Sequence, residues 1–256
     1  MDMQIINVRG VNFSNVTMEE AVRFLCERME NGNTAAVFTP NSEIVQSCID
    51  TPDLYGIINS AELIVPDGIG VVKAASILGT PLKERVAGFD LGLEMMKVAN
   101  EKKLKVFLFG GKDQTRCENG ISIADRCVKG MGEKYPNIDF VGTRHGYVSK
   151  TGEENDETIR LINESGAEIL YVCLGCPTQE KWICENRHRL PGVKVFLALG
   201  GSLDGYTGIV KRAPKIFIDL GLEWFYRLLC QPSRFVRMLS LPKFYFGTWI
   251  YKFKKK

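Results

Sequence analysis

Short apolar runs alternate along the chain with longer segments whose apolar residues recur every three or four positions. Six runs are almost continuously apolar, as in strands that are buried on both faces of a parallel sheet. They predict strands at residues 34–38, 62–65, 105–109, 138–141, 169–174 and 193–199. The segments between them predict helices at 18–31, 42–49, 70–78, 91–101, 114–135, 153–164 and 178–189. This alternation predicts a Rossmann-like α/β fold, a parallel sheet with helices on both faces.

The pattern changes after residue 199. Gly200-Gly201 and Asp204-Gly205 are turn signals, and three prolines divide the rest of the chain. Each proline is expected to begin or break a short helix. We therefore expect an α/β catalytic domain at residues 1–208, followed by a helical appendage of two or three amphipathic helices at 209–256. Because no long linker separates the two, the appendage is expected to dock on the domain.

Composition excludes a disordered or collagen-like chain, since 45% of the 256 residues are hydrophobic and 25% are charged. The overall charge of +3 does not predict a nucleic-acid partner. Its distribution is uneven: residues 209–256 hold 11 Lys and Arg against 2 Asp and Glu, and residues 1–208 hold 22 against 28. The basic appendage also carries 11 of the 25 aromatic residues.

Basic residues interleaved with aromatic residues suit an anionic membrane surface. No stretch approaches the roughly 20 apolar residues that span a bilayer, and the N-terminus lacks the pattern of a secretory signal. The eight cysteines are mostly isolated along the chain, and this spacing fits reduced cytosolic thiols better than a framework of disulfides. We expect a cytoplasmic protein that is peripheral on the inner face of the cell membrane. The alternative is that the aromatic appendage is a subunit interface of a homo-oligomer.

Polar loops follow five of the predicted strands, at residues 39–42, 66–68, 110–111, 175–179 and 200–204. In an open parallel sheet the carboxyl ends of the strands meet at one edge, where ligands bind beside helix N-termini. Asp67, on a stiff turn between Pro66 and Gly68, suits a general base. The structural alternative is that Asp67 caps a helix that begins near Ile69.

Other positions at this edge suit an anionic ligand. Gly110 and Gly111 could cradle a phosphate with their N–H groups, although two glycines after a strand also form a plain tight turn. Arg85 and Gln179 could bind a diphosphate through charge-assisted hydrogen bonds, and the alternative for Arg85 is a solvated surface position. The sequence has no P-loop, serine-hydrolase elbow or zinc-protease motif, which excludes those classes, and we expect no metal site.

Taken together, the loop motifs closely resemble those of the WecG/TagA/CpsF glycosyltransferases. The match runs in order from about Asn7 to Arg237, which makes it far more specific than any one motif. The matching segments are Thr39-Pro40-Asn41, Pro66-Asp67-Gly68, Leu78-Gly79-Thr80-Pro81, Glu84-Arg85-Val86, Gly88-Phe89-Asp90, Phe109-Gly110-Gly111, Gly175-Cys176-Pro177-Thr178-Gln179-Glu180, Gly200-Gly201-Ser202-Leu203-Asp204, Arg212-Ala213-Pro214 and Gly221-Leu222-Glu223-Trp224.

The resemblance implies an activity. Members of the family transfer a sugar, commonly N-acetylmannosamine, from a UDP donor to undecaprenyl-diphosphate-linked N-acetylglucosamine, with inversion and without a metal. For this chain it implies UDP-N-acetylmannosamine as the donor, a polyprenyl-diphosphate-linked acceptor, no cofactor, and a role in making teichoic acid or a related surface polymer. N-acetylmannosaminuronate, glucose and galactose remain alternative donor sugars.

The resemblance also implies roles for individual residues. Asp67 matches the catalytic base and Thr39 its neighbour in the pocket. Arg85 and Gln179 match residues that contact the donor or stabilise the leaving diphosphate, and Asp204 matches a residue near the uracil. The remaining positions expected to bind substrate are Asn41, Gly110, Gly111 and Gly201, with Arg227, Arg234 and Arg237 closing over the site to meet the lipid diphosphate.

Two other classes compete with this interpretation. A nucleotide-binding dehydrogenase has a similar fold, but the chain lacks the dinucleotide fingerprint and an acidic ribose-binding residue at suitable spacing. A non-catalytic membrane adaptor would leave the polar loops of the domain unexplained. The glycosyltransferase hypothesis accounts for both the loops and the basic appendage.

Overall fold

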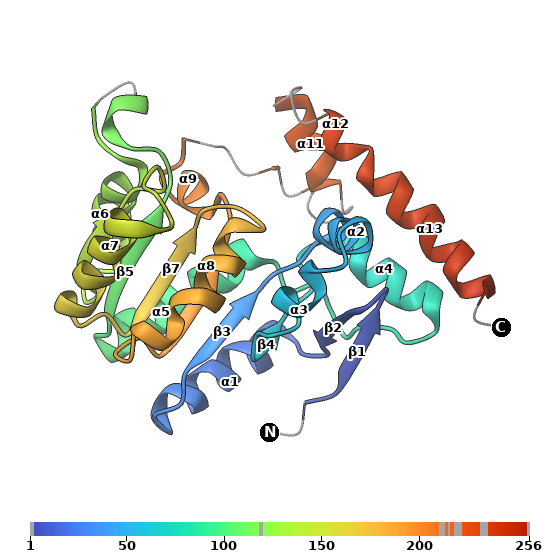
Figure 1. The fold of residues 1–256 in the computed structure, drawn as a ribbon, viewed down its shortest axis with the longest axis horizontal. Helices are drawn as coiled ribbons and strands as arrows, with labels where there is room; N and C mark the ends of the chain where they lie inside the picture. The colour runs from blue at the N-terminus through green and yellow to red at the C-terminus, as the bar shows by residue number, and fades with distance from the viewer. Residues whose placement is uncertain are drawn as a thin grey trace.

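The centre of the molecule is a six-stranded parallel sheet in the order β4-β3-β8-β7-β5-β6 (Figure 1). It is seen in a computed structural model that describes residues 3–117, 120–209, 213–214, 216–217, 222–230 and 235–254. The strands are β3 (Ala35–Phe38), β4 (Leu63–Ile64), β5 (Lys105–Gly110), β6 (Asp139–Arg144), β7 (Ile169–Cys173) and β8 (Val195–Ala198). All six lie where the apolar runs predict them, which confirms the expected α/β fold.

Helices cover both faces of the sheet. Alternate residues of each strand point to opposite faces and pack against different helices, so the sheet separates two buried clusters. On β8, Val195 and Leu197 belong to one buried cluster, and Phe196 and Ala198 belong to another. The first cluster includes residues of α1 (Met18–Glu30), α5 (Gly88–Lys102), α6 (Ile123–Lys134) and α9 (Ser202–Tyr206). The second includes residues of α7 (Gly152–Ser165) and α8 (Thr178–Asn186). A strand buried on both faces needs apolar residues throughout, as these runs have.

A third core lies beside the sheet, under a hairpin that the sequence analysis did not predict. The antiparallel strands β1 (Ile5–Val8) and β2 (Val11–Ser14) join through Arg9 and Gly10, both with positive φ, as two-residue hairpin turns require. Their alternate residues pack with α2 (Ser42–Asp50), α3 (Leu54–Ile58) and α4 (Ile69–Leu78). The overlooked signal is the alternation of apolar and polar residues in Ile6-Asn7-Val8 and Val11-Asn12-Phe13, on either side of a glycine.

The helix predicted at 114–135 is wrong in its first part. A 3-10 helix spans Gln114–Arg116, and α6 begins only at Ile123. Side chains impose this division, because Asp113 accepts from the Arg116 N–H at 3.0 Å and Ser122 caps α6 through the Asp125 N–H at 3.1 Å. The helix predicted at 178–189 likewise divides, since α8 ends at Asn186 and a 3-10 helix covers Arg187–Arg189.

The C-terminal segment is helical, as predicted. Its described helices are α11 (Glu223–Cys230), α12 (Phe235–Met238) and α13 (Ser240–Lys254). α13 packs against α2 and α4, where Phe244 is buried in the third core and Lys243 pairs with Asp50 at 2.8 Å. Docking of the appendage is thus confirmed, and the division at 208/209 stays a prediction. None of the described helices has the length and apolar character needed to cross a membrane.

Candidate active site

The loops that carry the predicted site residues lie at one edge of the sheet. Pairing in register places the ends of neighbouring strands side by side, with Phe38 next to Ile64 and to Ala198, and Gly110 next to Cys173. The loops after β3, β4, β5, β7 and β8 therefore share the carboxyl edge, as the sequence predicts. In Figure 1 this edge faces α11 and α12.

Asp67 is held between two loops of this edge. Its N–H donates to the Pro40 carbonyl at 3.3 Å, and its Oδ1 accepts from the Gly88 N–H, the first of α5, at 3.2 Å. The N-cap position of α4 is Gly68, one residue after Asp67, so Asp67 does not occupy the capping position of that helix. The half-buried carboxylate rests on the N-terminus of α5, a position that favours an anion.

Thr39 lies beside Asp67 because both contact the start of α5. Its hydroxyl donates to the Ala198 carbonyl at 3.2 Å, which ties the end of β3 to the end of β8. A Cβ added at Gly88 would lie only 2.9 Å from Thr39 Oγ1. The structure thus brings Asp67 and Thr39 together around Gly88, a glycine to which the sequence analysis gave no role. The signal for it was its place in the motif shared with the family.

Asn41 performs a structural task at this edge. Its Oδ1 accepts from the Ile44 N–H at 3.1 Å and so caps α2. A Cβ at Gly68 would lie 3.7 Å from Asn41 Cβ, which places the side chain next to the turn that carries Asp67. The predicted substrate contact of Asn41 stays a prediction, with a capping role beside it.

Gly110 and Gly111 are explained by close packing. Both have positive φ, at 143° and 72°, and the Gly111 N–H donates to the Cys173 carbonyl at 3.3 Å. A Cβ added at Gly110 would lie 2.3 Å from the same carbonyl oxygen. These contacts show that the two glycines form a tight turn after β5 that packs against β7. Their predicted contact with a phosphate stays a prediction.

We predict that Gly110→Ala destabilises the fold. The new Cβ meets backbone rather than a flexible side chain, so strain and overpacking should together lower the free energy of unfolding by about 2 kcal/mol or more. Urea unfolding measures the change. Gly130→Ala is the matched control, since Gly130 is exposed within α6 with nothing within 4 Å, and it should raise stability by about 0.5–1 kcal/mol. Equal stability of the two variants would contradict this explanation.

Gly201 and Asp204 lie together at the end of β8. Gly201 is the N-cap position of α9, and a Cβ there would lie 3.9 Å from Asp204 Oδ2. Burial raises the pKa of the half-buried Asp204 carboxyl, against the opposing effect of the Lys112 ammonium. The predicted contact of Asp204 with the uracil stays a prediction.

Gln179 is almost fully buried, with 2% of its surface exposed. Its Oε1 accepts from the N–H groups of Gly175, at 3.1 Å, and Gly200, at 2.9 Å. The side chain therefore connects the loop after β7 to the loop after β8, a role that its sequence position does not reveal.

Arg85 joins the α/β domain to the appendage. Its guanidinium lies 3.4 Å from the Glu223 carboxylate of α11, and each side chain is less than one fifth exposed. The sequence alternative of a solvated surface position for Arg85 is therefore wrong. Arg227 and Arg237 belong to α11 and α12, but their side chains, like all of Arg234, lie outside the described residues.

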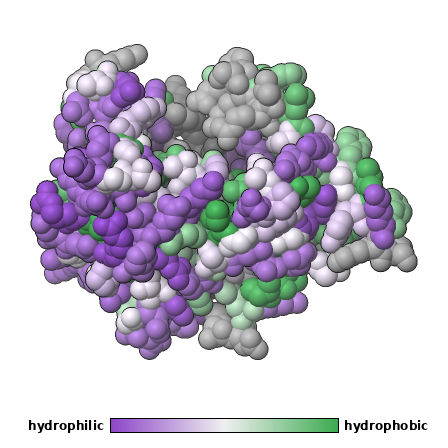
Figure 2. All heavy atoms as spheres, in the orientation of Figure 1, coloured by the Kyte–Doolittle hydropathy of each residue, from purple (hydrophilic) through white to green (hydrophobic). Residues whose placement is uncertain are grey.

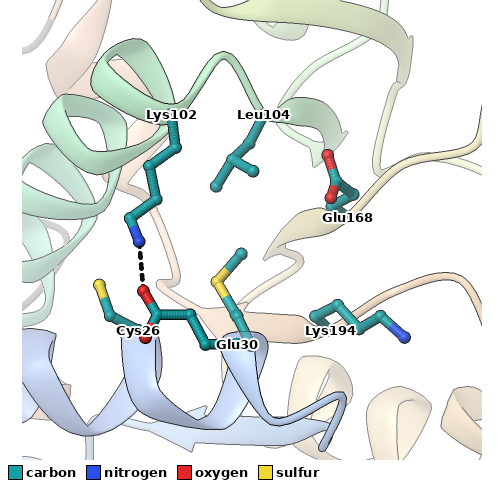
Figure 3. A pocket seen from close by; sticks show the side chains of 7 residues that line it. Cys26, Glu30, Lys102, Leu104, Glu168 and Lys194 are labelled. Carbon is teal, nitrogen blue, oxygen red and sulfur yellow. Dashed lines mark hydrogen bonds and ion pairs between the residues drawn. The ribbon is translucent and has the colours of Figure 1, made fainter.

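A cavity of about 160 Å³ lies at the opposite edge of the sheet, away from these loops (Figure 3). Lys102 and Glu30 form an ion pair across one side of it, and Lys194 and Glu168 stand on the other (Figure 3). Within the part of the chain that the structure describes, no three His, Cys, Asp or Glu side chains gather as metal ligands would.

A parallel sheet covered on both faces, with polar loops gathered at its carboxyl edge, is the architecture of nucleotide-binding α/β enzymes. Residues 6–256 match the model of the glycosyl transferase WecG/TagA/CpsF family. The chain belongs to this family, which confirms the resemblance and sets aside the dehydrogenase and adaptor interpretations.

Curated relatives agree with the family assignment. The chain is 35% identical over 243 residues to N-acetylglucosaminyldiphosphoundecaprenol N-acetyl-beta-D-mannosaminyltransferase of Bacillus subtilis (strain 168), covering 94% of this chain and 90% of that one. Proteins of the same name are 37% identical in Bacillus spizizenii W23, over 84% of this chain and 79% of that one, and 34% identical in Staphylococcus aureus MRSA252, over 98% and 94%.

Proposed function

We propose that this protein transfers N-acetylmannosamine from UDP-N-acetylmannosamine to undecaprenyl-diphosphate-linked N-acetylglucosamine, in the synthesis of teichoic acid or a related surface polymer. The observation that carries the proposal is the similarity to three mannosaminyltransferases over 84 to 98% of the chain. The arrangement of Asp67 and Thr39 at the carboxyl edge supports it, because it supplies a base where ligands bind in such sheets.

In the proposed reaction Asp67 takes the proton of the acceptor hydroxyl as that oxygen attacks the anomeric carbon of the donor sugar. The bond between this carbon and the UDP oxygen breaks, and UDP leaves from the opposite face, so the configuration inverts. The hydrogen bond from Gly88 fixes the carboxylate at the start of α5. The Thr39 hydroxyl donates to the Ala198 carbonyl and so fixes the end of β3 against the end of β8, next to Asp67.

The departing UDP carries negative charge that cations or helix N-termini must stabilise. Arg85 is the candidate on the domain side, with Arg227, Arg234 and Arg237 as candidates from the appendage. We expect no metal to be needed. The Arg85–Glu223 ion pair gives this cation a counter-charge before substrate binds, so the donor diphosphate has to compete with Glu223.

This competition leads to a prediction for the pair. Glu223→Gln should lower the KM for the UDP-sugar two- to fivefold, because a partly exposed ion pair contributes up to about 1 kcal/mol. Arg85→Gln should lower kcat roughly 100-fold through loss of charge stabilisation in the transition state. Steady-state kinetics measure both effects. Lys83→Gln is the control, because Lys83 lies in the same loop as Arg85 but pairs with Glu20. This variant should leave KM and kcat unchanged. An equal loss of kcat in K83Q and R85Q would exclude a specific role for Arg85.

We propose that the appendage places the enzyme on the inner face of the cell membrane. Figure 2 shows hydrophobic surface over α13, whereas the side that carries α6 and α7 is mainly hydrophilic. The exposed large apolar side chains of the three described helices, together with Leu239 between α12 and α13, are Trp224, Phe225, Leu229, Phe235, Leu239, Tyr245, Phe246, Trp249, Ile250 and Phe253. With the basic residues nearby, this surface suits anionic lipid and would bring the carboxyl edge to a lipid-linked acceptor.

The experiment that tests the donor is UDP release from a panel of UDP-sugars, with and without the lipid-linked acceptor. Release that depends on the acceptor and is fastest with UDP-N-acetylmannosamine is the expected result. Faster release from the N-acetylmannosaminuronate, glucose or galactose donor would retain the glycosyltransferase and replace the sugar. No release of UDP from any of the donors would overturn the proposal.

A further inference from the structure

The side chain of Gln179 has only one orientation that satisfies its surroundings. Its Oε1 faces two backbone donors, the N–H groups of Gly175 and Gly200, while its Nε2 donates to Glu180 Oε1 at 2.9 Å. Exchanging the two ends of the amide would set an NH₂ group against two N–H donors. Glu180 therefore accepts from the Gln179 NH₂ group, which keeps the Gln179 amide oxygen directed at the N–H groups of the two loops.

Glu180 is itself an unusual residue in this place. Only 1% of its surface is exposed, and Oε2 makes no hydrogen bond of normal geometry within the described residues. Burial raises the pKa of the carboxyl, with opposing effects from Gln179 and the Cys176 thiol. The titratable groups that face it are thiols, Cys176 on its own loop and Cys48 on α2. A buried acid without a cation is costly, so packing alone does not account for it.

The loops that meet at Gln179 carry site residues. Gly175 follows β7, and Gly200 directly precedes Gly201 and lies four residues before Asp204. The end of β8 is also the point where Thr39 binds the Ala198 carbonyl. A change in the position of the Gln179 amide would therefore move the backbone on which the donor site is built.

We propose that Glu180 is a positioning residue, which fixes the Gln179 amide so that this side chain locks the β7 and β8 loops in the geometry that binds the nucleotide diphosphate. The nucleotide part of this inference rests on the proposed function. The locking itself is a property of the fold and can be tested without substrate.

Two substitutions separate the acceptor from the charge. Glu180→Gln keeps the shape and one acceptor oxygen, whereas Glu180→Met removes the acceptor at similar volume. In E180M we expect the amides of Gly175 and Gly200 to exchange with solvent at least tenfold faster, measured by NMR, and the Kd for UDP to rise about tenfold by calorimetry. In E180Q both quantities should stay within about threefold of wild type.

Asn186→Ala is the control for a general loss of stability. Asn186 lies on the same helix α8, buried in a network with Asn155 and Trp182, so its loss should weaken the fold without reaching the loops. If E180M alters exchange at the two glycines no more than N186A does, the positioning role is wrong. If exchange changes as expected but wild type binds no UDP, the locking stands and the proposed function fails.

The pH dependence of stability gives a second readout. Because the pKa of Glu180 in the fold lies above its usual value of 4.5, its contribution to stability is complete at low pH and is lost as pH rises through the raised pKa. E180Q does not ionise, so wild type should lose stability relative to E180Q as pH increases from about 4.5. A difference that is constant with pH would show that the carboxyl does not carry a raised pKa.

Discussion

Asp67→Asn should lower kcat by about 10²- to 10⁴-fold, because the variant keeps the shape of the side chain but cannot take a proton from the acceptor hydroxyl. The asparagine Oδ1 can still accept the Gly88 N–H, which lies 3.2 Å from the present carboxylate oxygen. The fold and the KM for the UDP-sugar should therefore change little. Acceptor-dependent UDP release under saturating donor measures the loss.

Asp113→Asn is the matched control for this substitution. Asp113 follows β5 at the same edge and caps a 3-10 helix, so the variant removes an equal charge away from the proposed base. We expect kcat of D113N to remain within about threefold of wild type. A kcat for D67N that equals that of D113N would return Asp67 to a structural role at the start of α5.

Replacing the apolar face of α13 should abolish membrane binding. Phe246, Trp249, Ile250 and Phe253 are spaced three and four residues apart, so they form one stripe of the helix, and they are 37 to 67% exposed. The variant combines Phe246→Ser, Trp249→Gln, Ile250→Ser and Phe253→Ser. Fully burying one such side chain contributes about 1.5–3 kcal/mol, so even partial insertion of all four predicts that the variant loses at least a hundredfold in affinity for the membrane. Flotation with anionic vesicles measures it.

The fold should tolerate these four substitutions, because α13 packs on the domain through a different stripe. Phe244 and Thr248 are buried there, and the Arg9 guanidinium stacks on Tyr251 at 5.0 Å. Activity with a lipid-linked acceptor should fall with vesicle binding, whereas activity with a short-chain acceptor should not. Ile5→Ser combined with Ile121→Ser removes exposed apolar residues elsewhere and is the control. Unchanged vesicle binding with a loss of self-association in sedimentation would identify the stripe as a subunit interface.

The sequence predicts the sheet well because a strand that is buried on both faces is apolar at nearly every position. Residues 169–174 and 193–199 are apolar at almost every position, and they become β7 and β8. Short elements are harder to predict. The hairpin β1–β2 depends on positive φ at Arg9 and Gly10, and the division of the helix predicted at 114–135 depends on the caps at Asp113 and Ser122.

The site shows the same limit. Topology alone places Asp67 and Thr39 at one edge, so their proximity could be predicted. The contacts that hold each side chain could not, because they join residues far apart in the chain. Asp67 is 21 residues from Gly88, Gln179 is 21 from Gly200, and Arg85 is 138 from Glu223. Such pairs depend on the packing of loops in three dimensions.

The most direct test of the central claim is to identify the product. Wild-type protein would be incubated with UDP-N-acetylmannosamine and undecaprenyl-diphosphate-linked N-acetylglucosamine, and the lipid fraction analysed by mass spectrometry and NMR. The account predicts a lipid that has gained one N-acetylmannosamine residue with inverted anomeric configuration, and predicts its near absence with D67N. An unchanged lipid beside intact donor, or a product with retained configuration, would contradict it.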